Sequence, residues 1–150
     1  MVGPTIVTWI LVVLGWLLAL VLVFGQGLMI LRPHSQRTRE IVIGRGEDWR
    51  DRTHFKSAYG LAVGDLVVQV PLVAAGSVGV VMGEAWGYLL WAAGGSIAVY
   101  ISIVLWFLER EYVYPKVGPL AYYTYFWGSF LYWGLAAAAY SVLRIVGVRF

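Results

Sequence analysis

Residues 5–31 read TIVTWILVVLGWLLALVLVFGQGLMIL, a run of 27 residues without a charged side chain. A bilayer core of roughly 30 Å is crossed by about 20 apolar residues in a helix, because each residue advances the helix by about 1.5 Å. The run is therefore long enough to cross a membrane as one helix. Arg32 and Pro33 follow it directly, and the charge and the proline together end the predicted helix.

Three further segments share this composition, namely residues 59–83, 85–108 and 117–143. Together with residues 5–31 they hold 103 of the 150 residues, and Asp65 is the only formal charge among them. This composition predicts an all-α, polytopic integral membrane protein, a four-helix bundle that forms a single domain over the whole chain. Four spans would put both termini on the same side of the membrane.

The polar loop 32–58 is the largest segment outside these spans. It carries seven Lys or Arg side chains against four acids, and the link between the third and fourth spans adds two more cations. Because positively charged loops usually stay in the cytoplasm, we expect both loops there and both termini outside. The formal net charge of +3 suits anionic lipid headgroups better than nucleic acid, so we expect no nucleic-acid partner.

Side chains that hold cofactors in other membrane proteins are scarce in this sequence. The chain has no cysteine, which excludes disulfides, iron–sulfur ligands and thiol nucleophiles. Its two histidines, His34 and His54, lie in one polar loop, and its two lysines, Lys56 and Lys116, lie at helix margins. We therefore expect neither a haem between two helices nor a retinal Schiff base, and no cofactor is predicted.

Asp65 carries the strongest functional signal in the sequence. An ionisable group two turns inside a membrane span costs about 2.5–3.5 kcal/mol on insertion scales, so it usually has a role inside the protein. Asp65 could act as a proton donor or as the counter-ion of a cationic ligand, with Gln69 one turn deeper on the same helix face. The competing interpretation is a structural hydrogen bond to Gln69 or to a tyrosine of another helix.

Gln26 and the aromatic fourth span are the other candidates inside the membrane. Gln26 lies between two glycines, where its amide could form a helix–helix hydrogen bond or a pocket wall. Helical spacing places five positions of the fourth span on one face: Tyr122, Tyr125 or Phe126, Ser129, Trp133 and Tyr140. Interfacial anchoring explains Tyr122, whereas Trp133 lies mid-span and could stabilise a positive charge by cation–π attraction. Core packing or lipid contact explains Trp133 equally well.

Proline and glycine add two expectations about the second span. Pro71 interrupts it, which predicts a kink in the wall of a cavity or a tolerated structural kink. Gly60 with Gly64, and Gly79 with Gly83, are small residues four positions apart, and such pairs let helix backbones approach closely. We therefore expect compact packing of this span against its neighbours.

The order of several short motifs resembles the EXPERA superfamily, which includes the emopamil-binding sterol isomerase and the cholesterol-associated sigma-type receptor. The resemblance covers about the C-terminal two-thirds of the chain. It rests on Phe55-Lys56-Ser57, on Asp65-Leu66-Val67-Val68-Gln69-Val70-Pro71, on Val104-Leu105-Trp106-Phe107-Leu108-Glu109, and on Pro119-Leu120 followed by Tyr122, Tyr125-Phe126 and Trp133.

The resemblance implies a four-helix core whose pocket opens toward the membrane and takes sterol-like lipids or amphiphilic amines. Asp65 matches the second-helix acid of these isomerases, and Trp133 matches the tryptophan that faces a carbocation. The first-helix acid of the family falls on Gln26, so the pair of acids that moves a proton is incomplete here. Asp51 replaces the missing acid if the polar loop folds over the pocket, as a loop aspartate does in the receptor branch.

Three hypotheses about function follow from the sequence. The first is a binding site for a sterol- or isoprenoid-like lipid, built from Gln26, Asp65, Gln69 and Trp133 with loop 32–58 as a partial lid. Further candidate binding residues are Asp51, Glu109, Tyr122, Tyr125 and Ser129. The second is a carbocation-type lipid isomerase or cyclase with Asp65 as proton donor, Trp133 as cation stabiliser, and Asp51 or Glu109 as acceptor. The third is a small structural subunit of a larger membrane complex, or a homodimer, packed through its glycine-rich and aromatic faces.

Overall fold

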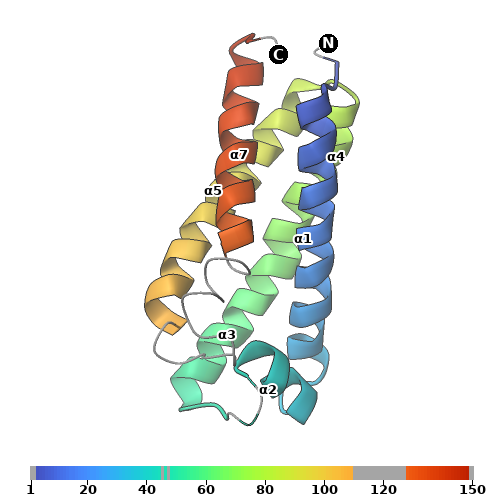
Figure 1. The fold of residues 1–150 in the computed structure, drawn as a ribbon. Helices are drawn as coiled ribbons and strands as arrows, with labels where there is room; N and C mark the ends of the chain where they lie inside the picture. Colours follow the sequence, from blue (N-terminus) through green and yellow to red (C-terminus); the bar gives the residue numbers. More distant parts are fainter. Residues whose placement is uncertain (1–2, 45, 47, 110–127, 149–150) are drawn as a thin grey trace.

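The computed structural model describes residues 3–44, 46, 48–109 and 128–148, and no residue in these ranges forms a β-strand. The all-α prediction is therefore confirmed for this part of the chain. The elements are α1 (Ile6–Leu31), α2 (Gln36–Val42), α3 (Arg52–Gly64), the π-helical turn η1 (Asp65–Gln69), α4 (Val70–Val81), α5 (Ala85–Glu109) and α7 (Gly128–Ile145). The long helices lie side by side, and the short α2 lies at the end opposite the termini (Figure 1).

Three helical stretches are long and apolar enough to cross a membrane: Ile6–Leu31, Arg52–Val81 and Ala85–Leu108. They correspond to the first three predicted spans. Of the predicted fourth span, the structure describes only the part that lies in α7, an 18-residue helix. The start of α1 and the end of α7 lie at the same end of the molecule (Figure 1).

The first turn of α3 differs from the sequence prediction. Asp51 is the N-cap of this helix, and its Oδ1 accepts hydrogen bonds from the backbone N–H groups of Thr53 at 2.6 Å and His54 at 2.9 Å. Because this cap satisfies two otherwise unpaired donors, the helix begins at Arg52, seven residues before the predicted start at residue 59. The polar loop is shorter than predicted, and it contains the helix α2 as well.

A wide helical turn lies just before Pro71, where the sequence predicted a kink. The backbone N–H of Val70 donates to the carbonyl of Asp65, the five-residue spacing of a π-helix, and α4 continues directly from this turn. Proline has no N–H and its ring crowds the carbonyl four residues earlier, here that of Val67. Through the wide turn η1, α3 and α4 form one continuous rod. Asp65 is the first residue of this turn.

Glycines set the closest contacts between the helices. A Cβ added to Gly79 would lie 2.5 Å from Gly87 Cα, and a Cβ added to Gly95 would lie 2.6 Å from the Gly134 carbonyl oxygen. The backbones of α4 and α5, and of α5 and α7, therefore touch at these points, as small residues allow.

Two of the predicted glycine contacts are wrong. A Cβ added to Gly60 or to Gly64 would meet no atom within 4 Å, so at these positions α3 makes no close contact with another described helix. Gly83 has a positive φ of 73° and forms the turn between α4 and α5, a conformation that glycine adopts without strain. The closest backbone contacts thus join α4, α5 and α7, and Gly60 and Gly64 of α3 take no part in them.

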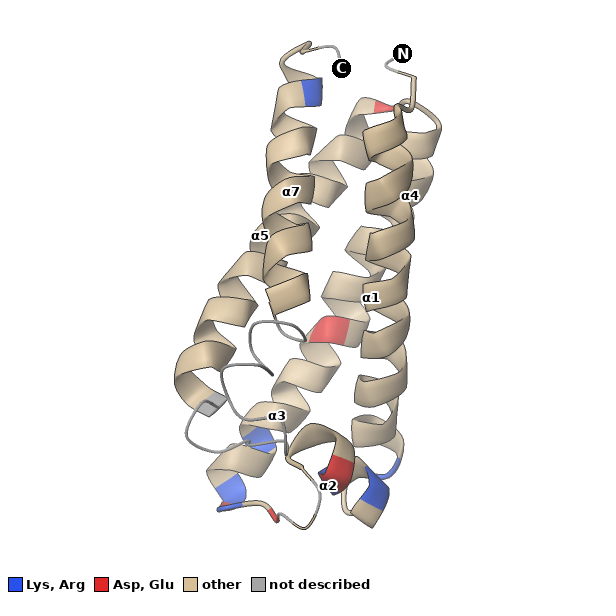
Figure 2. Ribbon diagram, viewed as in Figure 1, with Lys and Arg blue, Asp and Glu red and all other residues tan. Residues whose placement is uncertain are grey.

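The buried core lies mainly toward the end that carries the termini. Trp91 and Trp133 pack edge to face with ring centroids 6.2 Å apart, and both are almost fully buried. The Tyr140 hydroxyl forms hydrogen bonds with Thr5 Oγ1 at 2.7 Å and Thr8 Oγ1 at 2.6 Å, which join α7 to the start of α1. By contrast, most charged residues collect at the opposite end, around α2 and the start of α3 (Figure 2).

Candidate functional site

A cavity of about 460 Å³ lies between α1, α2, the α3–η1 rod, α5 and α7. This volume is within the usual range for sites that bind small molecules. The described residues that line the cavity are Leu17, Leu20, Val21, Leu22, Phe24, Gly25, Gln26, Ile41, Val42, Ala58, Leu61, Asp65, Ile101, Leu105 and Phe130. All except Gln26 and Asp65 are apolar.

Gln26 and Asp65 form one polar pair in this apolar wall. The amide Nε2 of Gln26 donates to Asp65 Oδ2 at 2.9 Å, which joins α1 to the wide turn η1. Within the described residues, the other carboxylate oxygen of Asp65 and the amide oxygen of Gln26 accept no hydrogen bond. Each oxygen has lone pairs that remain available to a group in the cavity. The sequence prediction named both residues, and the structure brings them together.

Gln69 does not share the cavity with Asp65. Its side chain is only 4% exposed, and its Nε2 donates to the backbone carbonyl of Gly94 in α5 at 3.0 Å. The prediction assumed α-helical spacing between Asp65 and Gln69, but the two residues bound a π-helical turn, whose wider spacing changes the angle between them. Gln69 therefore faces α5, and its role in the structure is to join two helices.

Trp133 also lies outside the described lining of the cavity, contrary to the prediction. Its indole Nε1 donates to the carbonyl of Leu11 at 2.9 Å, and its ring lies so close to Gly15 that an added Cβ there would be 2.9 Å away. Trp133 is 4% exposed, so core packing, one of the interpretations that the sequence left open, applies to it. Phe130, about one turn earlier in the same helix, contacts the cavity instead.

Asp51 cannot pair with Asp65, because the two lie far apart on the same helical rod. They are separated by 14 residues, which corresponds to about 20 Å at a rise of about 1.5 Å per residue. The backbone N–H groups of His54 and Thr53 bind the Asp51 carboxylate and hold its pKa below the usual value. Among the described residues of loop 32–58, Ile41, Val42 and Ala58 line the cavity, and no acid does.

The remaining predicted residues have no described contact with the cavity. Ser129 lies half-buried in the first turn of α7 and is not among the lining residues. Glu109 ends α5, but its side chain lies outside the described part of the structure, as do Tyr122 and Tyr125.

The composition of the described wall limits the chemistry of the site. One carboxyl group and one amide can bind a hydrogen-bonding or cationic group, but no second titratable side chain among the described lining residues could exchange a proton with Asp65. Within the described ranges, no three His, Asp or Glu side chains gather as metal ligands.

Comparisons of the chain with protein-family models, with curated proteins and with solved structures find no match.

Proposed function

We propose that this chain is a multi-pass integral membrane protein that binds a sterol- or isoprenoid-like lipid in the cavity beside Asp65. In this proposal α1, the α3–α4 rod, α5 and α7 are the four helices of a membrane bundle. The long apolar stretches of the first three support it, as does the close contact of α7 with α5 at Gly134 and Gly95. The sequence resemblance to the EXPERA superfamily points to the same class of ligand.

The observation that carries the proposal is the polar pair in an otherwise apolar cavity. A carboxyl group inside a membrane is costly, and it is usually kept for a functional contact. The apolar body of a ligand would pack against side chains such as Leu20, Ile101 and Leu105. A hydroxyl or amine of the ligand would then reach the available oxygens of Gln26 and Asp65.

Binding is better supported than turnover. An isomerase or cyclase needs a group that accepts the proton after Asp65 has donated one, and the described cavity wall offers no second acid or base. The indole of Trp133 is used in helix packing, so it does not support a cation-stabilising role. A purely structural role in a larger complex would leave the cavity and its polar pair without a purpose.

The test is the affinity of a cationic amphiphile, such as a long-chain isoprenoid amine, for wild-type protein and Asp65→Asn. Loss of a charge-assisted contact, worth about 1.5–3 kcal/mol, should weaken binding about tenfold or more. Expression and thermal unfolding should change little, because Asp65 is only half-buried. Asp48→Asn is the matched control, since Asp48 is exposed and pairs with Arg39 outside the cavity. Equal affinity of wild type and Asp65→Asn would reject the site.

A further inference from the structure

Two independent observations place Arg37 at the rim of the cavity. It precedes Ile41 by four residues in α2, so the two side chains share a helix face, and Ile41 lines the cavity. Its guanidinium carbon also lies 5.7 Å from the centroid of the Phe24 ring, and Phe24 lines the same cavity from α1. The guanidinium group is therefore next to the cavity, at the end of the molecule where α2 lies.

No acid in the described part of the structure neutralises the charge of Arg37. Within the described residues Arg37 is exposed and forms no ion pair. Two described acids close to it in sequence have other partners: Asp48 pairs with Arg39 at 3.2 Å, and Glu40 accepts a hydrogen bond from Gln36 at 2.8 Å. The planar guanidinium therefore keeps donors for an external anion, and its fork geometry suits phosphate and carboxylate groups.

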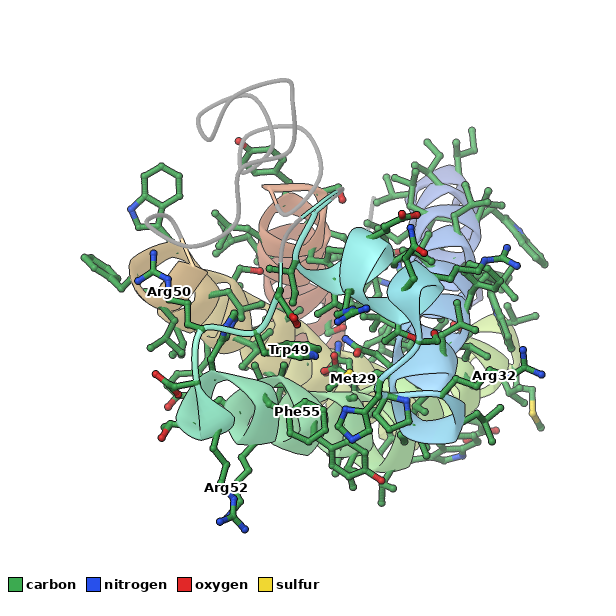
Figure 3. The ribbon with its side chains drawn as sticks, turned by 90° about the horizontal axis from the view of Figure 1, so that it is seen from below. Met29, Arg32, Trp49, Arg50, Arg52 and Phe55 are labelled. Atoms are coloured by element: carbon green, nitrogen blue, oxygen red, sulfur yellow. The ribbon has the colours of Figure 1, made fainter. Side chains whose placement is uncertain are left out.

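The surroundings of Arg37 are those of a lipid headgroup region. Lys and Arg residues gather at this end (Figure 2), and Arg32 and Arg52 point outward from it (Figure 3). Arg37 differs from these two, because the described contacts place only its side chain against a residue of the cavity wall. An amphiphile would therefore place its headgroup near Arg37 and its apolar body deeper, past Gln26 and Asp65.

We propose that Arg37 forms an anion subsite at the rim, which binds the phosphate or carboxylate head of an amphiphile whose apolar body fills the cavity. This inference rests on the proposed function, and it adds the charge of the headgroup. The cavity then has two oppositely charged binding groups, Arg37 at its rim and Asp65 further inside. Their opposite charges orient the ligand, because Asp65 repels an acidic head that Arg37 attracts.

Three probes with the same isoprenoid chain distinguish binding at Arg37 from binding at Asp65: a phosphate monoester, an alcohol and an amine. In nanodiscs of neutral phosphatidylcholine, the wild-type protein should bind the phosphate about tenfold more tightly than the alcohol, as expected for a charge-assisted contact. Arg37→Gln should lower the affinity for the phosphate to that for the alcohol. Asp65→Asn should weaken binding of the amine and leave that advantage of the phosphate over the alcohol intact.

Arg39→Gln is the matched control for Arg37→Gln. It removes the same charge from the same short helix, but Arg39 is held by Asp48. This variant should keep the preference for the phosphate. If it loses as much affinity as Arg37→Gln, general surface charge explains the preference and the subsite is rejected.

The remaining outcomes separate the subsite from the proposed function. If the wild-type protein binds phosphate and alcohol equally, the subsite is wrong while the cavity remains a lipid site. If no probe binds, the proposed function itself fails. Displacement of the phosphate probe by excess inorganic phosphate would mean that Arg37 binds free anions, which also contradicts an amphiphile anchored at this rim.

Discussion

The helix α1 passes through two unlike halves of the molecule. In the terminal half, which contains residues 3–15, the part of α5 around Trp91, and residues 133–145 of α7, side-chain hydrogen bonds from α7 fix α1 and the residues that precede it. These run from Arg144 to the Gly3 carbonyl, from Trp133 to the Leu11 carbonyl, and between Tyr140 and the threonines Thr5 and Thr8. In the cavity half, which contains Leu17–Leu31 of α1, α2, α3 and η1, Gln26–Asp65 is the one described side-chain hydrogen bond from α1 to another long helix.

The comparison shows how a small helical protein can hold a cavity. Folding stability differs between parts of a structure, and binding regions often belong to the less stable part. Here the terminal half holds most of the buried core, including Trp91, Trp133 and Tyr140. The cavity half can then leave space between helices, because it does not have to hold the helices together alone.

The largest effect on folding stability is expected from glycine-to-alanine substitutions, one in each half of α1. A Cβ at Gly15 would lie 2.9 Å from the Trp133 ring, whereas a Cβ at Gly25 would meet nothing within 4 Å. Gly15→Ala should lower the free energy of unfolding by about 1–3 kcal/mol, because Trp133 must shift in a packed core. Gly25→Ala should raise it by about 0.5–1 kcal/mol, because alanine favours a helix over the unfolded chain. Denaturation in mixed detergent micelles measures the free energy of unfolding of both variants.

Opposite signs for these two variants would support a packed terminal half and an open cavity half. Two equal losses of stability would mean that Gly25 is packed as tightly as Gly15. That result would remove the distinction between the halves.

A smaller effect, on the pH dependence of local helix stability, is expected at the polar end of the cavity half, where Asp51 caps α3. The backbone hydrogen bonds from His54 and Thr53 hold the pKa of Asp51 below its unfolded value of about 3.9. The cap therefore stabilises the helix fully above that value, and the stabilisation is lost as the pH falls through the lower pKa of the folded state. Amide hydrogen exchange of Thr53 and His54 should accelerate below about pH 4 relative to the intrinsic rate.

Asp51→Asn provides the control for this pH dependence. Asparagine caps helices about as well as aspartate but does not titrate in this range, so the acid-induced acceleration should disappear. If exchange at these two amides accelerates equally in both proteins, the Asp51 cap is not its cause.

The long helices could be predicted from the sequence because each contains a long apolar run with few or no charges. The predicted span 5–31 differs from α1 by one residue at its start, since Thr5 caps the helix. The start of α3 was missed because its first turn is polar and resembles a loop, although Asp51 is a good N-cap residue. The wide turn η1 could not be predicted, because a proline can equally well produce a kink.

The polar part of the site was easier to predict than its apolar wall. Asp65 and Gln26 stand out because polar side chains are rare in membrane spans, and they do meet. Phe130 and Ile101 carry no such signal, since an apolar residue that lines a cavity looks the same in sequence as one that packs or faces lipid. Trp133 shows the same limit: its spacing fitted a pocket, the core or a lipid-facing position equally well, and the structure places it in the core against Leu11.

The most direct test of the central claim, that this cavity holds a lipid, is native mass spectrometry of the purified protein. Gly25 lines the cavity with space beside it, so Gly25→Phe should fill part of the cavity without disturbing the packed half. Gly60→Phe adds the same side chain in an equally open position on α3 that does not line the cavity. The wild-type protein and Gly60→Phe should retain a bound lipid of one mass, and Gly25→Phe should lose most of it. Equal retention by all three proteins, or no retained lipid in the wild type, would contradict a lipid site in this cavity.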